Sequence, residues 1–274
     1  MATLEQDNPR VRSLAPESWI SQRLGSRFVG VISFAAFIAV WQVVVWVTRI
    51  NPILLPAPGS VLAQFFASIG EGLLVAAVLD SLRALFIGLV LALAVGIVAG
   101  LVIGGSQWLS LLTGPYLWAF FATPRIALLP LIILFLGLDL TTKIVMVFLS
   151  AVLPVTLSVK EGVQTVDESL LKAARSFGAS RLDLFRHVVI PFTLPFIANA
   201  IRNGISRGFV GLLIVEMSVG SGGIGTQVMR AMRQFNTARM FAFVAILIVT
   251  ALALITLSRM LETRVSKWRE QVYV

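Results

Sequence analysis

Uncharged stretches long enough to cross a membrane constrain this chain most. The longest runs from Ala84 to Pro124 without an acidic or basic residue. A helix needs about 20 largely apolar residues to cross the hydrocarbon of a bilayer, so this stretch suffices for most of two crossings. Gly104, Gly105 and Ser106 would supply the break between them. The sequence therefore predicts an all-α, polytopic membrane protein.

The composition excludes a soluble globule. Hydrophobic residues make up 58% of the 274 residues and charged residues 13%, against roughly 45–50% and ~25% in soluble domains. A globule of this composition would expose larger apolar patches than soluble proteins tolerate. The absence of cysteine excludes disulfides, thiol catalysis and cysteine-based metal sites.

Six spans follow from the distances between charged residues. The second helix of the long uncharged stretch is expected to begin near Pro115, because proline suits the first turn of a helix. The fifth span contains Pro191 and Pro195 and is expected to be kinked. The predicted transmembrane helices are 28–48, 82–103, 114–137, 141–159, 190–218 and 239–259.

The distribution of basic residues predicts the orientation. Thirteen of the 22 Lys and Arg residues fall in segments assigned to the cytoplasm and six in outer segments, which places both termini in the cytoplasm. The net charge of +9 thus reflects topology and not a nucleic-acid partner. The expected organisation is a cytoplasmic N-terminal segment (1–27), a transmembrane domain (28–259) with a cytoplasmic loop (160–187), and a cytoplasmic tail (260–274). The first span is expected to be retained and not cleaved as a signal peptide.

Small residues recur at every fourth position of the second span. Such spacing lets helix backbones approach closely in lipid, where apolar burial drives little association. A tight helix interface is therefore expected, either within the chain or between two copies. The residues are Gly88, Ala92, Gly96, Gly100 and Gly104, and Gly204 and Gly208 repeat the spacing once.

The long cytoplasmic loop has the pattern of two helices joined at a glycine corner. Asp167 can cap a first helix, and Gly178 suits the left-handed position that ends one. Ser180 with Asp183 three residues later resembles a capping box that starts the second helix. The first helix carries an apolar stripe that would dock in a partner's groove or lie on lipid headgroups. That stripe is Leu170, Ala174 and Phe177.

At these residues the sequence resembles the permease subunits of bacterial ABC importers, whose loop signature is Glu-Ala-Ala, three residues, Gly, nine residues, Ile-x-Leu-Pro. Ala173, Ala174, Gly178 and Pro191 match it at the family spacing, whereas Lys172 replaces the Glu and reverses its charge. Further similarity, including the segments 124–130, 176–180 and 223–225, is greatest to the nitrate, sulfonate, taurine and bicarbonate branch. The resemblance implies that the loop couples to an ATPase through Leu170, Lys172, Ala173, Ala174, Phe177, Gly178, Ala179 and Pro191.

The resemblance also implies a set of partners. These are a second copy of the chain, two ATPase subunits that hold ATP and Mg, and an extracytoplasmic solute-binding protein, in a bacterial plasma membrane. The chain has no Gly-x-x-x-x-Gly-Lys-Ser/Thr motif, so it is expected to bind no ATP itself. No cluster of reactive side chains is visible in the sequence, so no enzyme activity, metal or cofactor of its own is expected.

One polar face of the fifth span predicts a translocation path. Asn199, Arg202, Asn203 and Ser206 share one side of a helix. Ionisable residues within a membrane cost ~2.5–3.5 kcal/mol each and usually face an interior or an aqueous path. The alternative is that the arginines pair with Glu216 or with carbonyls freed by the prolines. The expected path residues are Arg125, Asn199, Arg202, Asn203, Ser206 and Arg207.

Glu216 lies near the outer end of the fifth span and is expected to act as a gate or in an ion pair. Three outer arginines, Arg230, Arg233 and Arg239, would meet either a binding protein or lipid headgroups. The favoured function is an importer permease that works by alternating access and carries a small anion. The rival function is an ion-coupled secondary transporter or a channel.

Overall fold

The computed structural model describes residues 19–265, in which every regular element is helical, and places the side chains of residues 28–260. The chain divides into two compact units, Met1–Ser60 and Val61–Val274. The elements are α1 (Trp19–Thr48), α2 (Pro58–Gly70), α3 (Leu73–Gly104), α4 (Gln107–Ala122), the 3₁₀ turn η2 (Arg125–Leu128), α5 (Leu129–Leu136), α6 (Leu140–Gln164), α7 (Glu168–Ser176), α8 (Arg181–Leu184), the π turn η3 (Phe185–Val189), α9 (Ile190–Val219), α10 (Ile224–Arg233) and α11 (Thr237–Val265).

The described helices confirm an all-α membrane protein. Five stretches are long and apolar enough to cross a bilayer, and a bent pair of helices would make a sixth if it counts as one span. The bent pair is Gln107–Ala122 with Arg125–Leu136. The five stretches are Phe28–Thr48, Leu73–Gly104, Leu140–Gln164, Arg181–Arg233 and Thr237–Met260.

The prediction of one straight helix over 114–137 is wrong. The chain forms two helices bent by 84° at a break. Pro124 has no N–H to donate and disfavours helical backbone at the residue before it, and Thr123 is accordingly extended. The expected start at Pro115 is also wrong, because Ser106 caps the helix from Gln107 by accepting a bond from the Leu109 amide.

Other helix bounds differ from the prediction because charged residues were taken as helix ends. The helix predicted over 82–103 begins at Leu73 and so also contains Asp80. The helix predicted over 141–159 continues to Gln164 and so includes Lys160. The first and last spans are likewise longer, Trp19–Thr48 and Thr237–Val265. Asp80 can lie within the helix because Lys143 pairs with it inside the protein.

Helices α3, α6 and α9 form the packed core of the second unit. The stripe of small residues on α3 lies against valines of α6, so the expected tight interface is within the chain. A Cβ built on Gly96 would lie 2.7 Å from Val155 Cγ1, and one on Gly100 would lie 2.7 Å from Val159 Cβ. Neither glycine can therefore gain a side chain without displacing α6. Buried side chains of all three helices complete this core, among them Leu85, Val147, Phe209 and Leu212.

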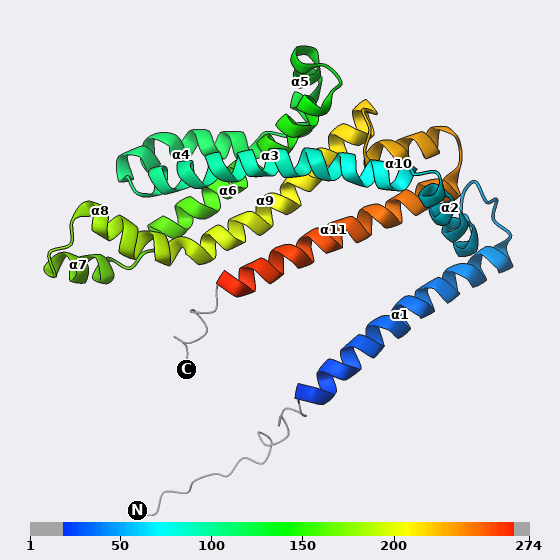
Figure 1. Ribbon diagram of the computed structural model, residues 1–274, viewed down its shortest axis with the longest axis horizontal. Helices are drawn as coiled ribbons and strands as arrows, with labels where there is room; N and C mark the ends of the chain where they lie inside the picture. Colours follow the sequence, from blue (N-terminus) through cyan, green and yellow to red (C-terminus); the bar gives the residue numbers. More distant parts are fainter. Residues whose placement is uncertain (1–18, 266–274) are drawn as a thin grey trace, which may run out of the picture. The chain divides into compact units, whose positions relative to one another are not determined.

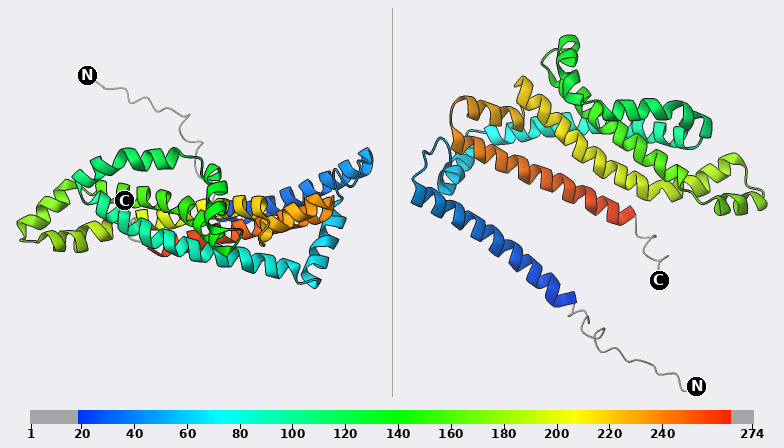
Figure 2. Two further views of the ribbon diagram at one scale, coloured as in Figure 1. Left: turned by 90° about the horizontal axis from the view of Figure 1, so that it is seen from above. Right: turned by 180° about the vertical axis from the view of Figure 1, so that it is seen from behind.

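The α3–α6–α9 bundle carries different elements at its two ends. Figures 1 and 2 show α7 and α8 at one end of the α3–α6–α9 bundle and α10 at the opposite end. Helix α9 runs from the first end to the second and links them. Helices α2 and α10, both short, were not predicted from the sequence.

Candidate functional site

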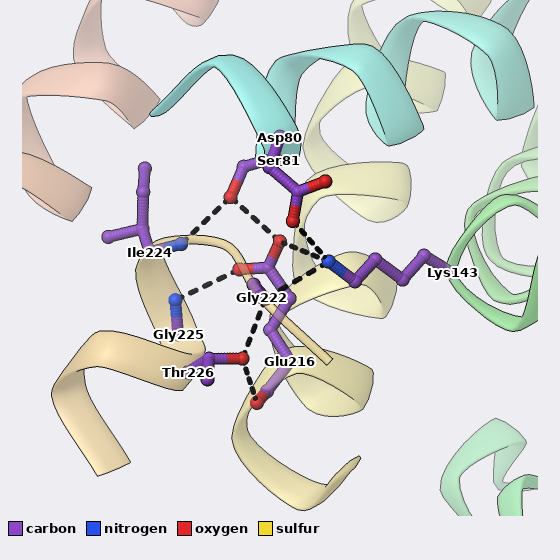
Figure 3. A network of polar contacts seen from close by, with 8 residues as sticks. All are labelled: Asp80, Ser81, Lys143, Glu216, Gly222, Ile224, Gly225 and Thr226. Carbon is purple, nitrogen blue, oxygen red and sulfur yellow. Dashed lines mark hydrogen bonds and ion pairs between the residues drawn. The ribbon is translucent and has the colours of Figure 1, made fainter. Parts of the chain in front are cut away.

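A buried ionic network occupies the α10 end of the bundle (Figure 3). Lys143 of α6 is 1% exposed, and its Nζ lies 2.6 Å from Oδ2 of Asp80 on α3. The same ammonium lies 3.9 Å from Oε1 of Glu216 on α9 and donates to the Gly222 carbonyl at 3.0 Å. One cation thus joins three helices and the turn that follows α9.

Neutral donors complete the coordination of Glu216, whose side chain is fully buried. The Ser81 hydroxyl donates to Oε1 at 2.7 Å, and the Gly225 amide donates to Oε2 at 2.9 Å. Ser81 Oγ in turn accepts the Ile224 amide at 2.9 Å, which leaves its proton for Glu216. Every contact to Glu216 therefore comes from a donor or a cation, as an ionised carboxylate requires.

The turn between α9 and α10 is shaped to fit this network. Gly220, Gly222 and Gly223 all have positive φ, at 74°, 98° and 90°, where residues with a Cβ are strained. A Cβ on Gly223 would also overlap the Glu216 carboxylate. The Thr226 hydroxyl closes the turn by donating to the Glu216 and Gly222 carbonyls at 2.9 and 2.6 Å.

Sequence reasoning singled out Glu216 but missed Asp80, Ser81 and Lys143. It placed Asp80 outside the second span and counted Lys143 only as an outer charge. The available signal was the glycine-rich segment just after Glu216, which allows the chain to turn back toward the other helices. No spacing rule pairs residues 63 and 73 positions apart, so only the packing of α3, α6 and α9 identifies them.

The polar face of α9 contains linked side chains. Arg202 Nη2 donates to Asn199 Oδ1 at 2.8 Å, and Asn199 Nδ2 donates to Ser158 Oγ of α6 at 3.5 Å. Asn203 and Arg207 are exposed on the same helix, and Ser206 is half-buried. The structure thus joins Asn199 and Arg202 directly and connects them to α6.

Arg125 lies at the break between α4 and α5, as the first residue of η2. Its guanidinium carbon stands 5.7 Å from the centre of the Phe121 ring. Its Nε and Nη2 are shielded from solvent and form no hydrogen bond with any described residue. Helix α9, which carries Arg207, packs against η2, and the two guanidinium groups repel each other. Two of the predicted path residues, on different helices, therefore influence each other through their charges.

The predicted helix corner is confirmed. Asp167 accepts the Ser169 amide at 2.8 Å and caps α7, and Ser180 with Asp183 forms a complete capping box at the start of α8. Gly178 adopts φ 83°, and the amides of Gly178 and Ala179 bond back to the Arg175 and Ala174 carbonyls. This pair of bonds is the Schellman arrangement that ends a helix.

The corner presents apolar and charged groups to its surroundings. Phe177 is 92% exposed and Leu170 47%, whereas Ala174 is half-buried. Lys172 pairs with Glu168 at 2.8 Å across one exposed helical turn. After the capping box the chain continues through η3 into α9, where Pro191 occupies the first turn. The second helix of the corner is therefore continuous with the span that carries the polar face.

The three arginines that were predicted to lie on the outer side have different environments. Arg239 donates two 2.8 Å bonds to the Glu71 carboxylate and a third to Gln64, so it ties α11 to α2. Arg230 and Arg233 are exposed on α10. Among the described residues, no group of three His, Cys, Asp or Glu side chains could hold a metal ion.

Residues 92–267 match the family described as the binding-protein-dependent transport system inner membrane component. The chain belongs to this family. It is an importer permease of the ABC class, a transport subunit and not an enzyme, and a multi-pass protein of the inner membrane. This assignment decides against an ion-coupled secondary transporter or a channel.

Named relatives align over nearly the whole permease. The taurine transport system permease TauC of Escherichia coli is 29% identical, covering 88% of this chain and 89% of TauC. The riboflavin transport system permease RibX of Chloroflexus aurantiacus is 30% identical, covering 95% of both chains. A solved chain of the MetNI methionine ABC transporter is 20% identical and superposes with a TM-score of 0.63, covering 70% of this chain and 96% of that one. This last likeness shows a shared fold.

Proposed function

We propose that the permease forms the membrane path for a small anion such as nitrate, a sulfonate, taurine or bicarbonate. The observation that supports this most directly is the placement of Arg125, Arg202 and Arg207 among apolar helices. Arginine remains charged in proteins, and charge within a membrane usually marks a solute path or an interior pairing site. The linked Asn199 and Arg202 side chains would provide hydrogen bonds along the path.

The names of the relatives support an anionic solute, but not every relative is named for one. TauC and the Bacillus subtilis permease SsuC are named for taurine and aliphatic sulfonates, both of which carry a sulfonate group. RibX is named for riboflavin. The choice of an anion for this permease therefore depends on its own arginines, together with the two sulfonate relatives.

Energy for transport would come from partner subunits, because this chain has no Walker A motif. Two copies of the permease would bind two ATPase subunits, which hold ATP and Mg, and a solute-binding protein would deliver the anion. The loop Lys160–His187 and both termini would face the cytoplasm. Closure of the ATPases would move the α7–α8 corner and shift the population between inward-open and outward-open states.

The ionic network would act as the outer gate element. It lies at the end of the bundle opposite α7 and α8 (Figure 1), and it ties α9, which carries the polar face, to α3 and α6. In this proposal Glu216 has the gating role and Lys143 holds it in place. Arg230 and Arg233, exposed on the adjacent α10, would contact the binding protein.

Reconstitution tests this function. The permease would be purified with the ATPase and solute-binding protein encoded beside it, and placed in liposomes containing ATP. Uptake of labelled nitrate, bicarbonate, taurine and alkanesulfonates is then measured. ATP-dependent uptake of one of these anions is expected, and an ATPase lacking its Walker lysine serves as the control. Uptake that needs no ATP contradicts the ATP-driven importer, whereas ATP-driven uptake of neutral solutes alone contradicts the anion path.

A further inference from the structure

We propose that Arg125 and Arg207 form an oxyanion-binding site inside the permease, at the break between α4 and α5. The site would hold a solute group with at least two oxygens on one centre, such as a sulfonate, nitrate or bicarbonate. This inference rests on the proposed anion path and assigns its selectivity to one pair of side chains.

The unpaired nitrogens of Arg125 lie on one edge of its guanidinium group. Nε and Nη2 carry parallel N–H bonds, and this is the edge that pairs with two oxygens of a carboxylate, phosphate or sulfonate. Both atoms are shielded from solvent without a hydrogen bond to any residue between 28 and 260. Buried donors left without an acceptor cost free energy, so this edge favours any oxyanion that can reach it.

The other contacts of Arg125 leave this edge available. The guanidinium carbon lies over the Phe121 ring, 5.7 Å from its centre, and an aromatic ring offers no oxygen acceptor to the N–H groups. Phe121 is itself fixed by an edge-on contact with Trp118, at 5.9 Å between ring centres. The aromatic pair thus orients Arg125 without satisfying its donors.

A second cation makes an anion electrostatically favourable here. Helix α9, which carries Arg207, packs against η2, which begins at Arg125, and the two guanidinium groups repel each other. No acidic side chain of the described residues forms a salt bridge with either. Two like charges held near each other among apolar helices are costly, and an anion between them removes the repulsion. A halide would lower the repulsion too, but an anion with two oxygens also matches the two parallel N–H bonds one to one.

Access to the site would depend on the break itself. Pro124 lacks an amide proton, and Thr123 is extended, so the helical hydrogen-bond ladder is interrupted at this point. A small change of the backbone at Thr123 and Pro124 would move Arg125 without unwinding α4 or α5. The anion would thus reach Nε and Nη2 in one state of the transport cycle and be released in another.

Direct anion binding tests this site. The permease–ATPase complex without binding protein is titrated with methanesulfonate, and tryptophan emission is followed because Trp118 packs on Phe121. A saturable change is expected for the wild type and not for Trp118→Phe. Chloride at equal ionic strength should give no saturable change. Arg125→Lys keeps the charge but loses the bidentate edge of the guanidinium group. The dissociation constant of this variant for methanesulfonate should therefore rise at least tenfold.

Matched controls separate binding from folding. Arg83→Lys makes the same change at an exposed site on α3 and should bind like the wild type. Arg207→Gln should also weaken methanesulfonate binding, even if Arg125→Lys fails to assemble with the ATPase. Equal responses to chloride and methanesulfonate, or wild-type binding by both variants, would overturn the site. So would the absence of any saturable effect of methanesulfonate on wild-type emission and thermal midpoint.

The uptake assay distinguishes this inference from the proposed function. If the wild type imports an anion with ATP but both variants import it equally per ATP hydrolysed, only the site is wrong. If the wild type imports no anion with ATP, the anion path itself is wrong. The ratio of anion imported to ATP hydrolysed is used because the binding protein sets the apparent KM of uptake.

Discussion

At the scale of single residues, the most consequential side chain is Lys143. It is a buried cation whose partners, Asp80 and Glu216, come from two other helices. Forming such a group gains little net stability, because desolvation offsets the attraction, but removing one member leaves an uncompensated buried charge. The network therefore contributes little net stability, but each of its members must be kept to balance the charge of the others.

Lys143→Met should lower the free energy of unfolding by about 3–5 kcal/mol, since Glu216 would remain buried with its main cation removed. The measurement is reversible denaturation of the purified permease in detergent micelles. Combining Lys143→Met with Glu216→Gln should recover part of the loss, because the amide removes the buried charge.

Lys172→Met is the matched control for this prediction. Lys172 also pairs with a carboxylate, but both side chains are exposed, and such a pair contributes less than about 0.5 kcal/mol. If Lys143→Met and Lys172→Met lower the free energy of unfolding equally, burial does not make the Lys143 ion pair more important for stability. No recovery in the double variant would mean that the cost lies in packing and not in charge.

At the scale of elements, the contact between α3 and α6 depends on the absence of side chains. Gly96→Ala would place a methyl group 2.7 Å from Val155 Cγ1 and 3.0 Å from the Val152 carbonyl. Overpacking of this kind costs about 1–3 kcal/mol. The thermal midpoint of the purified permease should fall, and adding Val155→Ala should partly restore it.

Gly114→Ala provides the comparison within another helix. A Cβ at Gly114 would meet nothing within 4 Å, and alanine is favoured over glycine inside a helix by roughly 0.5–1 kcal/mol. This variant should match or exceed the wild-type midpoint. If Gly96→Ala behaves like Gly114→Ala, the proposed close contact of α3 and α6 is wrong.

The cap of α7 should make that helix sensitive to acid. The Ser169 amide, donating to the Asp167 carboxylate, lowers the pKa of Asp167 below its ordinary value of 3.8. Because the folded pKa is depressed, the capping contribution is complete above pH ~4 and is lost as the pH falls through the folded pKa. Hydrogen exchange of α7 amides, corrected for intrinsic rates, should therefore accelerate as the pH falls below about 4.

Asp167→Asn should remove this pH dependence, because asparagine caps helices without titrating. The amides of α4, which the non-titrating Ser106 hydroxyl caps, serve as the internal reference. The same acid response in the variant would show that another group controls α7.

At the scale of the whole molecule, the α7–α8 corner and the ionic network lie at opposite ends of α9 (Figure 1). The capping-box helix continues through the π turn η3 into α9. A single continuous path of backbone therefore runs from the corner to Glu216, which suits a rigid-body shift between two states.

Gly178→Val should abolish most ATP-driven uptake while the permease still inserts and binds its ATPase. A Cβ at Gly178 would meet nothing within 4 Å, so the cost is that of the left-handed backbone, φ 83°, which a β-branched residue adopts poorly. Uptake into proteoliposomes should fall at least tenfold. Asparagine tolerates this conformation, so Gly178→Asn should retain most activity; equal uptake by all three proteins would contradict the prediction.

Local chemistry explains which features the sequence could predict. The caps at Asp167 and Ser180, the left-handed Gly178 and the break at Gly104–Ser106 depend on neighbours within a few residues, and the structure confirms each. Apolar runs predicted an all-α membrane protein because hydrocarbon admits few backbone arrangements. The missed bend at Pro124 was also local, and the X-Pro signal that predicts it was present.

The amino-acid sequence by itself determined the helical membrane class, the helix corner and its signature, because these follow from hydropathy and short-range hydrogen bonding. Tertiary structure alone decided that Lys143 joins Asp80 and Glu216, that the α3 glycines face α6, and that Arg125 lies near Arg207. These pairings connect positions far apart in the chain. Their energies depend on how helices dock and exclude water, which no spacing along the sequence encodes.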